Sequence, residues 1–282
     1  LKAFGSQSAQ KVWYPSQHAN SASPGHARLV QAFRRDMDEG AAMLEAWIAE
    51  AAAADTEILI VSAEDFCRFL SEDLGRVMDV MRPHPVHLII TQRNVRSLWP
   101  SAYQEQIKHG QTNDFDAPGT AERLQSNNRA IRKTIVSDIY HVVRPDSATI
   151  VIGDKTAPPG ALIGDFLTAA GLPPLQESDV EPLSVNRSHG LIELEVIRHL
   201  NMAMKSLEKK GVEAELPLIR RKLVHTMMQD HWRKTFPRLP LVVPESWEPI
   251  IAESAAAIFN DIKDLEAKGL IAVIGDPEHI RA

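Results

Sequence analysis

Short runs of apolar, often β-branched residues alternate along the chain with longer amphipathic stretches. The runs at 57–62, 86–91 and 149–153 have the length and composition of buried strands. Helical patterns are predicted at 24–54 (as one helix or two), 65–81, 95–108, 121–136, 159–170, 191–209 and 244–268. Strands that alternate with helices indicate a parallel sheet covered by helices. From about Leu175 the strand pattern ends, so the sequence predicts a helical C-terminal third.

The chain carries no internal repeat and no low-complexity linker that would mark a domain border. Its 282 residues allow one large domain or two modest ones. We expect a single α/β domain over 1–282, with an α/β core over 1–174 and a mainly helical part over 175–282.

Composition narrows the classes of function. Hydrophobic residues make up 44% and charged residues 24%, and Cys67 is the single cysteine, which excludes a disordered chain, a collagen and a disulfide scaffold. The formal charge of −6 disfavours a broad nucleic-acid surface but allows a local basic pocket for a small anion. No apolar run reaches the roughly 18 residues of a membrane span. The expectation is therefore a cytoplasmic protein with no nucleic-acid partner.

Several familiar motifs are missing from the sequence. There is no Gly-x-Gly-x-x-Gly after a strand, no Gly-Lys-Ser/Thr loop, no Gly-x-Ser-x-Gly elbow and no cysteine pair. The 11 histidines are scattered, and His225 and His231 do not have the spacing of metal ligands on one helix face. We expect no metal.

The segment 88–110 is the most informative part of the chain. A buried strand carries Arg93 to its carboxyl end, where open α/β sheets bind ligands, and Ser101 follows in the next helix. An arginine can place two N–H groups on a phosphate, and a hydroxyl can complete the contacts to its oxygens. The alternative is that Arg93 caps a helix or pairs with a surface carboxylate.

This spacing of Arg93, seven residues and Ser101, followed by Tyr103, resembles the 3′-phosphate-binding motif of PAPS-dependent sulfotransferases. Further segments resemble those of bacterial, carbohydrate-sulfotransferase-like members in the same order, namely 12–15, His26, 60–66, 150–172 and 185–188. The resemblance covers roughly 12–201. It implies a P-loop-type parallel sheet flanked by helices, with Arg93 and Ser101 binding 3′-phosphoadenosine 5′-phosphosulfate (PAPS).

The same resemblance implies a sulfotransferase that transfers a sulfuryl group from PAPS to a hydroxyl of a carbohydrate or small metabolite. The family's phosphosulfate-binding loop, Lys-x-Gly-Thr-Thr or similar, would lie before Leu1, and we expect it to have been truncated from this sequence. A protein that lacked the loop would be a catalytically inactive binding or scaffold protein of the same fold. A kinase or a glycosyltransferase is the third alternative.

Two side chains are candidates for the base that takes the acceptor proton. A histidine such as His26 titrates near neutrality unless it is buried, and Glu64 follows a predicted strand at its carboxyl end. Each also has a structural alternative. His26 could be a helix N-terminal side chain, and Glu64 could be a first-turn carboxylate in a helix that Ser62 caps.

The basic stretch at 216–238 has two readings as well. It is either a solvated helix face or part of a wall or lid that binds an anion.

Overall fold

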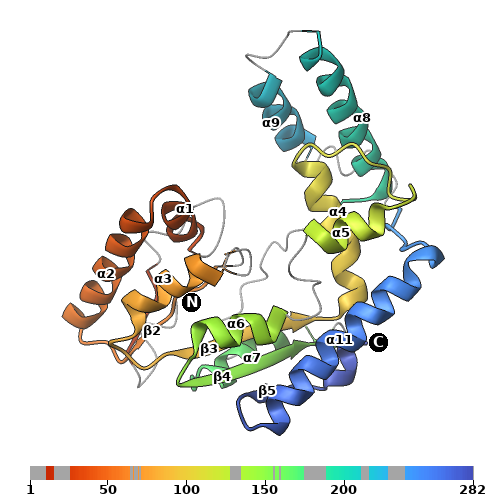
Figure 1. Cartoon of the computed structure of the whole chain (residues 1–282). Coiled ribbons are helices and arrows are strands. Elements are labelled where there is room, and N and C mark those ends of the chain that lie inside the picture. The colour runs from red at the N-terminus through yellow and green to blue at the C-terminus, as the bar shows by residue number, and fades with distance from the viewer. Residues whose placement is uncertain are drawn as a thin grey trace. The chain divides into compact units, whose positions relative to one another are not determined.

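The computed structural model describes residues 11–15, 26–63, 66, 69, 71–127, 135–154, 156–158, 160–174, 189–210, 216–227 and 239–281 (Figure 1). The chain divides into two compact units. The first comprises Leu1–Arg93, Lys133–Pro182 and Ala257–Ile280, and the second comprises Asn94–Arg132, Leu183–Ala256 and Arg281–Ala282. The expected single domain over 1–282 stays a prediction.

The first unit contains the strands. Its elements are β1 (Val12–Trp13), α1 (Ala27–Arg35), α2 (Met37–Ala53), β2 (Ile58–Leu59), α3 (Ser71–Met81), β3 (His87–Arg93), α6 (Ile135–Val143), β4 (Ser147–Gly153), α7 (Ala161–Ala169), β5 (Ala272–Ile274) and the 3-10 helix η7 (Pro277–Ile280). β1 pairs with β2, and β3, β4 and β5 form a second sheet in that order. Every strand pair is parallel, so the predicted mixed α/β fold with parallel sheets flanked by helices is confirmed.

β4 is the central strand of the three-stranded sheet. Five consecutive residues from Ala148 to Ile152 are buried, and this continuous burial explains the unbroken apolar run in the sequence. β3 pairs with it over seven residues, from His87 opposite Ser147 to Arg93 opposite Gly153. The predicted strands at 86–91 and 149–153 are thereby confirmed.

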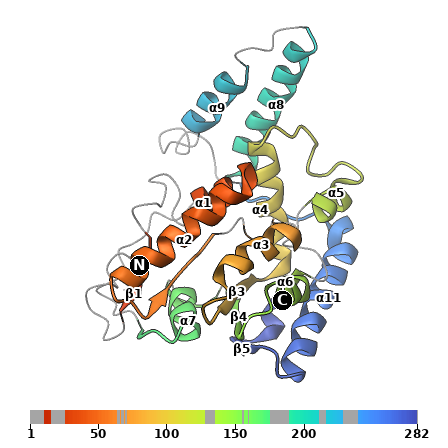
Figure 2. The same cartoon turned by 60° about the vertical axis from the view of Figure 1, so that its left-hand side comes forward.

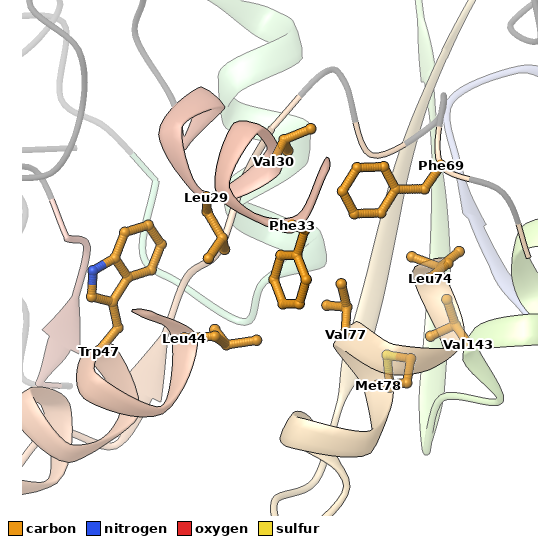
Figure 3. Close-up of a cluster of buried hydrophobic side chains, with 10 residues drawn as sticks. All are labelled: Leu29, Val30, Phe33, Leu44, Trp47, Phe69, Leu74, Val77, Met78 and Val143. Atoms are coloured by element: carbon orange, nitrogen blue, oxygen red, sulfur yellow. The ribbon is translucent and has the colours of Figure 1, made fainter. Parts of the chain in front are cut away.

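The main core of the first unit lies among α1, α2, α3 and α6 (Figure 3). Phe33 and Trp47 are buried there against the apolar faces of the neighbouring helices. Asp36 separates α1 from α2, because its side chain accepts hydrogen bonds from the first-turn N–H groups of α2. Gly40 then allows the two helices to approach, since a Cβ on it would lie 2.7 Å from the Cα of Phe33.

A second core joins α7 to the β1–β2 pair. Ile60, Leu167 and Leu172 are buried in it, and Tyr14 and Phe166 pack against them. α7 also lies against β3 and β4, so one helix contacts both sheets of this unit.

The second unit is helical in the part that the structure describes. It contains α4 (Val95–Lys108), α5 (Thr120–Asn127), α8 (Leu191–Glu208), α9 (Leu216–Met227), the 3-10 helix η6 (Glu245–Trp247) and the start of α11 (Glu248–Ala267), which continues into the first unit. α8 and α9 lie side by side (Figures 1 and 2). Trp99 is completely buried, with its ring 5.8 Å from that of Trp247, so it is a core residue.

One element contradicts the sequence prediction. The C-terminal third is mainly helical, but β5 at Ala272–Ile274 adds a parallel strand beside β4. The prediction that strands end near Leu175 was therefore wrong. The sequence pattern missed this strand because β5 has only three residues, too few to show a periodicity. Its backbone hydrogen bonds are made to β4, which is distant in the sequence.

Candidate functional site

Arg93 is the last residue of β3 and is exposed at the carboxyl end of the sheet. The Cγ of Arg93 lies 3.9 Å from the position that a Cβ on Gly153 would take, so the arginine side chain runs beside the end of β4. Within the described residues the structure records no ion pair for its guanidinium. The structure thus places Arg93 at the expected edge of the sheet, and its binding role stays a prediction.

α4 begins immediately after Arg93. The side chain of Asn94 accepts a hydrogen bond from Ser97 N–H at 3.1 Å and caps the helix, so Asn94 rather than Arg93 has the capping role. Ser101 is exposed in the second turn, and its hydroxyl donates to Ser97 O at 3.3 Å. Such a long bond to the preceding turn leaves the hydroxyl oxygen able to accept or exchange a partner.

Arg93 and Ser101 belong to different compact units. The structure therefore adds to the sequence motif the position of each residue within its own unit.

His26 is completely buried at the start of α1. Its Nδ1 accepts a hydrogen bond from Ser62 N–H at 2.9 Å, and its own backbone N–H donates to Ser62 O at 2.7 Å. The ring packs 4.5 Å from that of Tyr14 and 4.8 Å from that of Trp47. An Nδ1 that accepts from a backbone N–H carries no proton, so this geometry favours a neutral, structural histidine that fixes the end of β2 to α1.

Several residues singled out in the sequence lie outside the described residues. They include the second candidate base, Glu64, and the 185–188 segment that supports the sulfotransferase resemblance. Of the basic stretch at 216–238, the structure describes α9, in which Lys222 is exposed.

The carboxyl edge of the three-stranded sheet carries two further titratable side chains, Asp154 and His279. Asp154 directly follows β4, and His279 lies in η7, which contacts both β3 and β4. His279 Nδ1 is 4.0 Å from Asp154 Oδ2, and 38% of the His279 side chain is exposed. Arg93, Asp154 and His279 therefore share one edge of one unit.

Asp154 is held in its ionised form at this edge. Thr156 donates its backbone N–H to Asp154 Oδ1 at 2.7 Å and its hydroxyl to the same atom at 2.8 Å. These bonds, with a smaller contribution from His279, lower the pKa of Asp154 below its ordinary range. The ionised Asp154 carboxylate therefore lies beside the His279 ring.

Sequence reasoning missed both residues for different reasons. Asp154 follows a predicted strand directly, so the rule that selected Arg93 would have selected it too. His279 had no such signal, because β5 was not predicted. Gly275 brings the chain close to β4 at this point: it has φ +91°, and a Cβ on it would lie 2.8 Å from Ile152 O.

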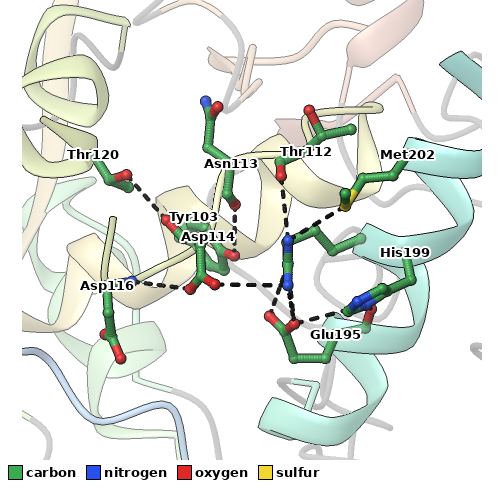
Figure 4. A network of polar contacts seen from close by, with 10 residues as sticks. Tyr103, Thr112, Asn113, Asp114, Asp116, Thr120, Glu195, His199 and Met202 are labelled. Carbon is green, nitrogen blue, oxygen red and sulfur yellow. Dashed lines mark hydrogen bonds and ion pairs between the residues drawn. The ribbon is translucent and has the colours of Figure 1, made fainter. Parts of the chain in front are cut away.

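In the second unit, Arg198 of α8 is the centre of a polar network (Figure 4). Its guanidinium donates to Glu195 at 2.5 Å and lies 3.7 Å from Asp114. Tyr103 donates its hydroxyl to Asn113 O at 3.0 Å, and burial, with a smaller contribution from Glu195, raises the pKa of Tyr103. The network joins α4, the loop after it and α8 through hydrogen bonds and ion pairs, so it links the elements of this unit.

No family model, curated protein or solved structure matches the chain. The functional conclusion therefore rests on the chain's own residues and on the motif in segment 88–110. Among the described residues, no group of three or more His, Cys, Asp or Glu side chains is placed to hold a metal ion, and no helix has the length and apolar character to cross a membrane.

Proposed function

We propose that the protein is a PAPS-dependent sulfotransferase that acts on a hydroxyl of a carbohydrate or small metabolite, within a P-loop-type fold. The observation that carries the proposal is the position of Arg93 at the carboxyl end of a buried parallel strand, followed by a capped helix that bears Ser101. Ligands of open α/β sheets bind at this edge.

Each side chain has the chemistry that binding of the donor's 3′-phosphate would require. Arg93 is exposed and offers a fork of N–H donors, the arrangement that suits a phosphate. Ser101 is exposed and its present hydrogen bond, at 3.3 Å, is long enough to be replaced. PAPS would be a substrate here, consumed in each turnover.

The reaction is an in-line transfer. The acceptor oxygen attacks sulfur, a new S–O bond forms, and the bond between sulfur and the bridging phosphate oxygen breaks. The acceptor proton passes to a base, and 3′-phosphoadenosine 5′-phosphate (PAP) leaves. Positioning and charge stabilisation contribute most of the acceleration, by analogy with phosphoryl transfer.

His279 fits the role of the base better than His26 does. A base must come within about 3 Å of the acceptor proton, which a completely buried ring cannot do without rearrangement. His279 is partly exposed at the same sheet edge as Arg93, with the Asp154 carboxylate 4.0 Å from its Nδ1. Glu64 stays a further candidate outside the described residues.

Calorimetric titration with PAP tests the binding site. We expect PAP to bind and Arg93→Ala to weaken binding by about 1.5–3 kcal/mol, or roughly 10- to 150-fold, because hydrogen bonds from a charged donor are lost. Arg96→Ala is the matched control, since Arg96 is an exposed neighbour whose charge is already paired with Glu248. Equal affinity of the wild type and Arg93→Ala would remove Arg93 from the site.

Transfer itself is tested by incubating the protein with PAPS and a panel of carbohydrate and small hydroxyl acceptors. Acceptor-dependent release of PAP supports the enzyme. PAP binding without any release across the panel would instead support a binding protein of the same fold.

A further inference from the structure

A pocket lies at the opposite edge of the three-stranded sheet from Arg93, beside the amino ends of β3 and β4. It has a volume of about 270 Å³ and is lined by Met78, Arg82, His84, Val86, Arg144 and Asp146. All of these residues belong to the first unit. The volume is close to the lower end of the range for small-molecule sites.

Basic side chains reach this pocket from two helix ends. Arg82 directly follows α3, His84 lies two residues further on, and Arg144 directly follows α6. Arg82 is 3.7 Å from Asp79, and both side chains are about 60% exposed, so water screens this pair strongly. Arg144 uses its Nε in a bond of 3.4 Å to His141 O. A guanidinium has five N–H donors, so Arg144 retains others for a ligand.

The carboxylate of Asp146 in this pocket has a structural role. Asp146 accepts a hydrogen bond from Val86 N–H at 2.8 Å through Oδ2, and its own backbone N–H donates to Val86 O at 3.0 Å. These bonds join the segments that enter β3 and β4. Asp146 is therefore explained by the fold, whereas neither Arg82 nor Arg144 is required by it.

Arg144 also occupies an unfavourable backbone conformation. Its φ is +46°, in the left-handed region that glycine adopts without strain at the end of a helix. An arginine at this position carries a conformational cost that a glycine would avoid. This unfavourable backbone conformation motivates the hypothesis that the Arg144 side chain has a binding role.

One feature of the fold opposes anion binding in this pocket. α3 and α6 both end beside this pocket, and the carbonyl groups at helix C-termini disfavour an anion and favour cations. If Arg82 and Arg144 only balanced these helix ends, the pocket would bind no anion. Anion binding is therefore the measurement that decides between the two roles.

We propose that this pocket is an oxyanion site, which binds a phosphate or sulfate group that is either free or part of a small molecule. Arg82 and Arg144 hold the oxygens, and His84 completes the basic wall. Met78 and Val86 provide apolar surface for whatever the group is attached to. The site is separate from the sheet edge that carries Arg93 and does not depend on the proposed activity.

Calorimetric titrations with inorganic phosphate, sulfate and glycerol 3-phosphate test the proposal. We expect at least one of them to bind, and Arg144→Gly to weaken its binding by about tenfold or more while the unfolding midpoint stays equal or rises, because glycine relieves the backbone strain. Asp146→Asn should tighten binding, since it removes a negative charge and keeps an oxygen acceptor for Val86 N–H. Arg76→Ala, on the exposed face of α3 and outside the pocket, is the control and should bind like the wild type.

The same titrations distinguish a free oxyanion from one that is part of a larger molecule. Tighter binding of glycerol 3-phosphate than of the inorganic ions assigns the site to a phosphorylated molecule, and equal binding assigns it to the free ion. The proposal is overturned if none of the three probes binds, or if Arg144→Gly binds as tightly as the wild type. It is also overturned if binding is lost in Arg93→Ala, because the anion would then occupy the other edge of the sheet.

Discussion

At the scale of single residues, His26 and His279 differ in how far their side chains are exposed. His26 is completely buried and accepts a backbone hydrogen bond, whereas His279 is partly exposed beside an ionised carboxylate. A ring enclosed by Tyr14 and Trp47 stabilises the fold through contacts that a smaller residue would lose. A partly exposed ring makes fewer such contacts and can reach a ligand.

We therefore expect opposite effects from two substitutions. His26→Ala should lower the free energy of unfolding by about 3 kcal/mol, because it creates a cavity and leaves the Ser62 N–H without its acceptor. His279→Gln should leave stability nearly unchanged and lower kcat about 100-fold or more, the usual contribution of a general base. Urea unfolding and PAP release measure the two effects.

His109→Ala is the control for His26→Ala, since its side chain is 73% exposed and a surface change of this kind alters stability by less than about 0.5 kcal/mol. An inactive His26→Ala protein with wild-type stability would return the catalytic role to His26. Full turnover in His279→Gln would remove His279 from the reaction.

At the scale of elements, the carboxyl edge of the three-stranded sheet depends on how closely the chain after β5 approaches β4. Gly275 directly follows β5 with φ +91° and leaves no room for a Cβ beside Ile152. The chain then turns into η7, whose Ile280 is completely buried. The position of η7, and with it that of His279, thus depends on one glycine.

Two glycine substitutions should change stability in opposite directions. Gly275→Ala should destabilise the protein by more than about 1 kcal/mol, because the left-handed conformation and the contact with Ile152 O both oppose a Cβ. Gly75→Ala, in α3 with open space around it, should stabilise by about 0.4–1 kcal/mol. Urea midpoints at unchanged m-values measure both, and a shift of the same sign in the two variants would contradict the explanation.

At the scale of the whole molecule, the parallel sheets all lie in one unit, and the described part of the other is helical. The three-stranded sheet offers two edges with different chemistry. Arg93, Asp154 and His279 lie at its carboxyl edge, and the basic pocket lies at its amino edge. A net charge of −6 therefore coexists with local cationic groups at both ends of the sheet.

Acid should weaken the fold partly through Asp154. Its pKa is lowered in the folded protein, so its contribution to stability is present above the ordinary range of an aspartate and is lost as the pH falls through the folded-state value. We expect Asp154→Asn to be less stable than the wild type at pH 7, and the difference to shrink as the pH falls below about 4. Urea unfolding at a series of pH values measures this difference, and a difference that is independent of pH would contradict it.

The sequence predicted the elements whose patterns are long and local. Apolar runs identified β3 and β4, and the helix predicted at 95–108 is α4 with the same bounds. The helix at 24–54 is interrupted at Asp36, whose side chain caps the second of two helices. The helix predicted at 121–136 corresponds to α5 and the first residues of α6, with 128–134 outside the described residues.

Only part of the candidate site could be predicted from the sequence. Arg93 and Ser101 lie where a strand pattern and a helix pattern place them, and Asp154 could have been found by the same rule. The burial of His26 could not, because the residues that contact it come from the segment after β1, from α2 and from the segment after β2. Side-chain burial depends on such distant partners, which no local pattern encodes.

By itself the sequence determined the alternation of strands and helices, because hydrophobic periodicity records which face of each element is buried. Only the tertiary structure decided that β5 joins β4, that His279 reaches Asp154, and that Arg82 and Arg144 line one pocket. Each of these pairs is far apart in the chain. Parallel pairing and helix packing bring such residues together through backbone hydrogen bonds and apolar contacts between distant segments, and that information belongs to the folded chain as a whole.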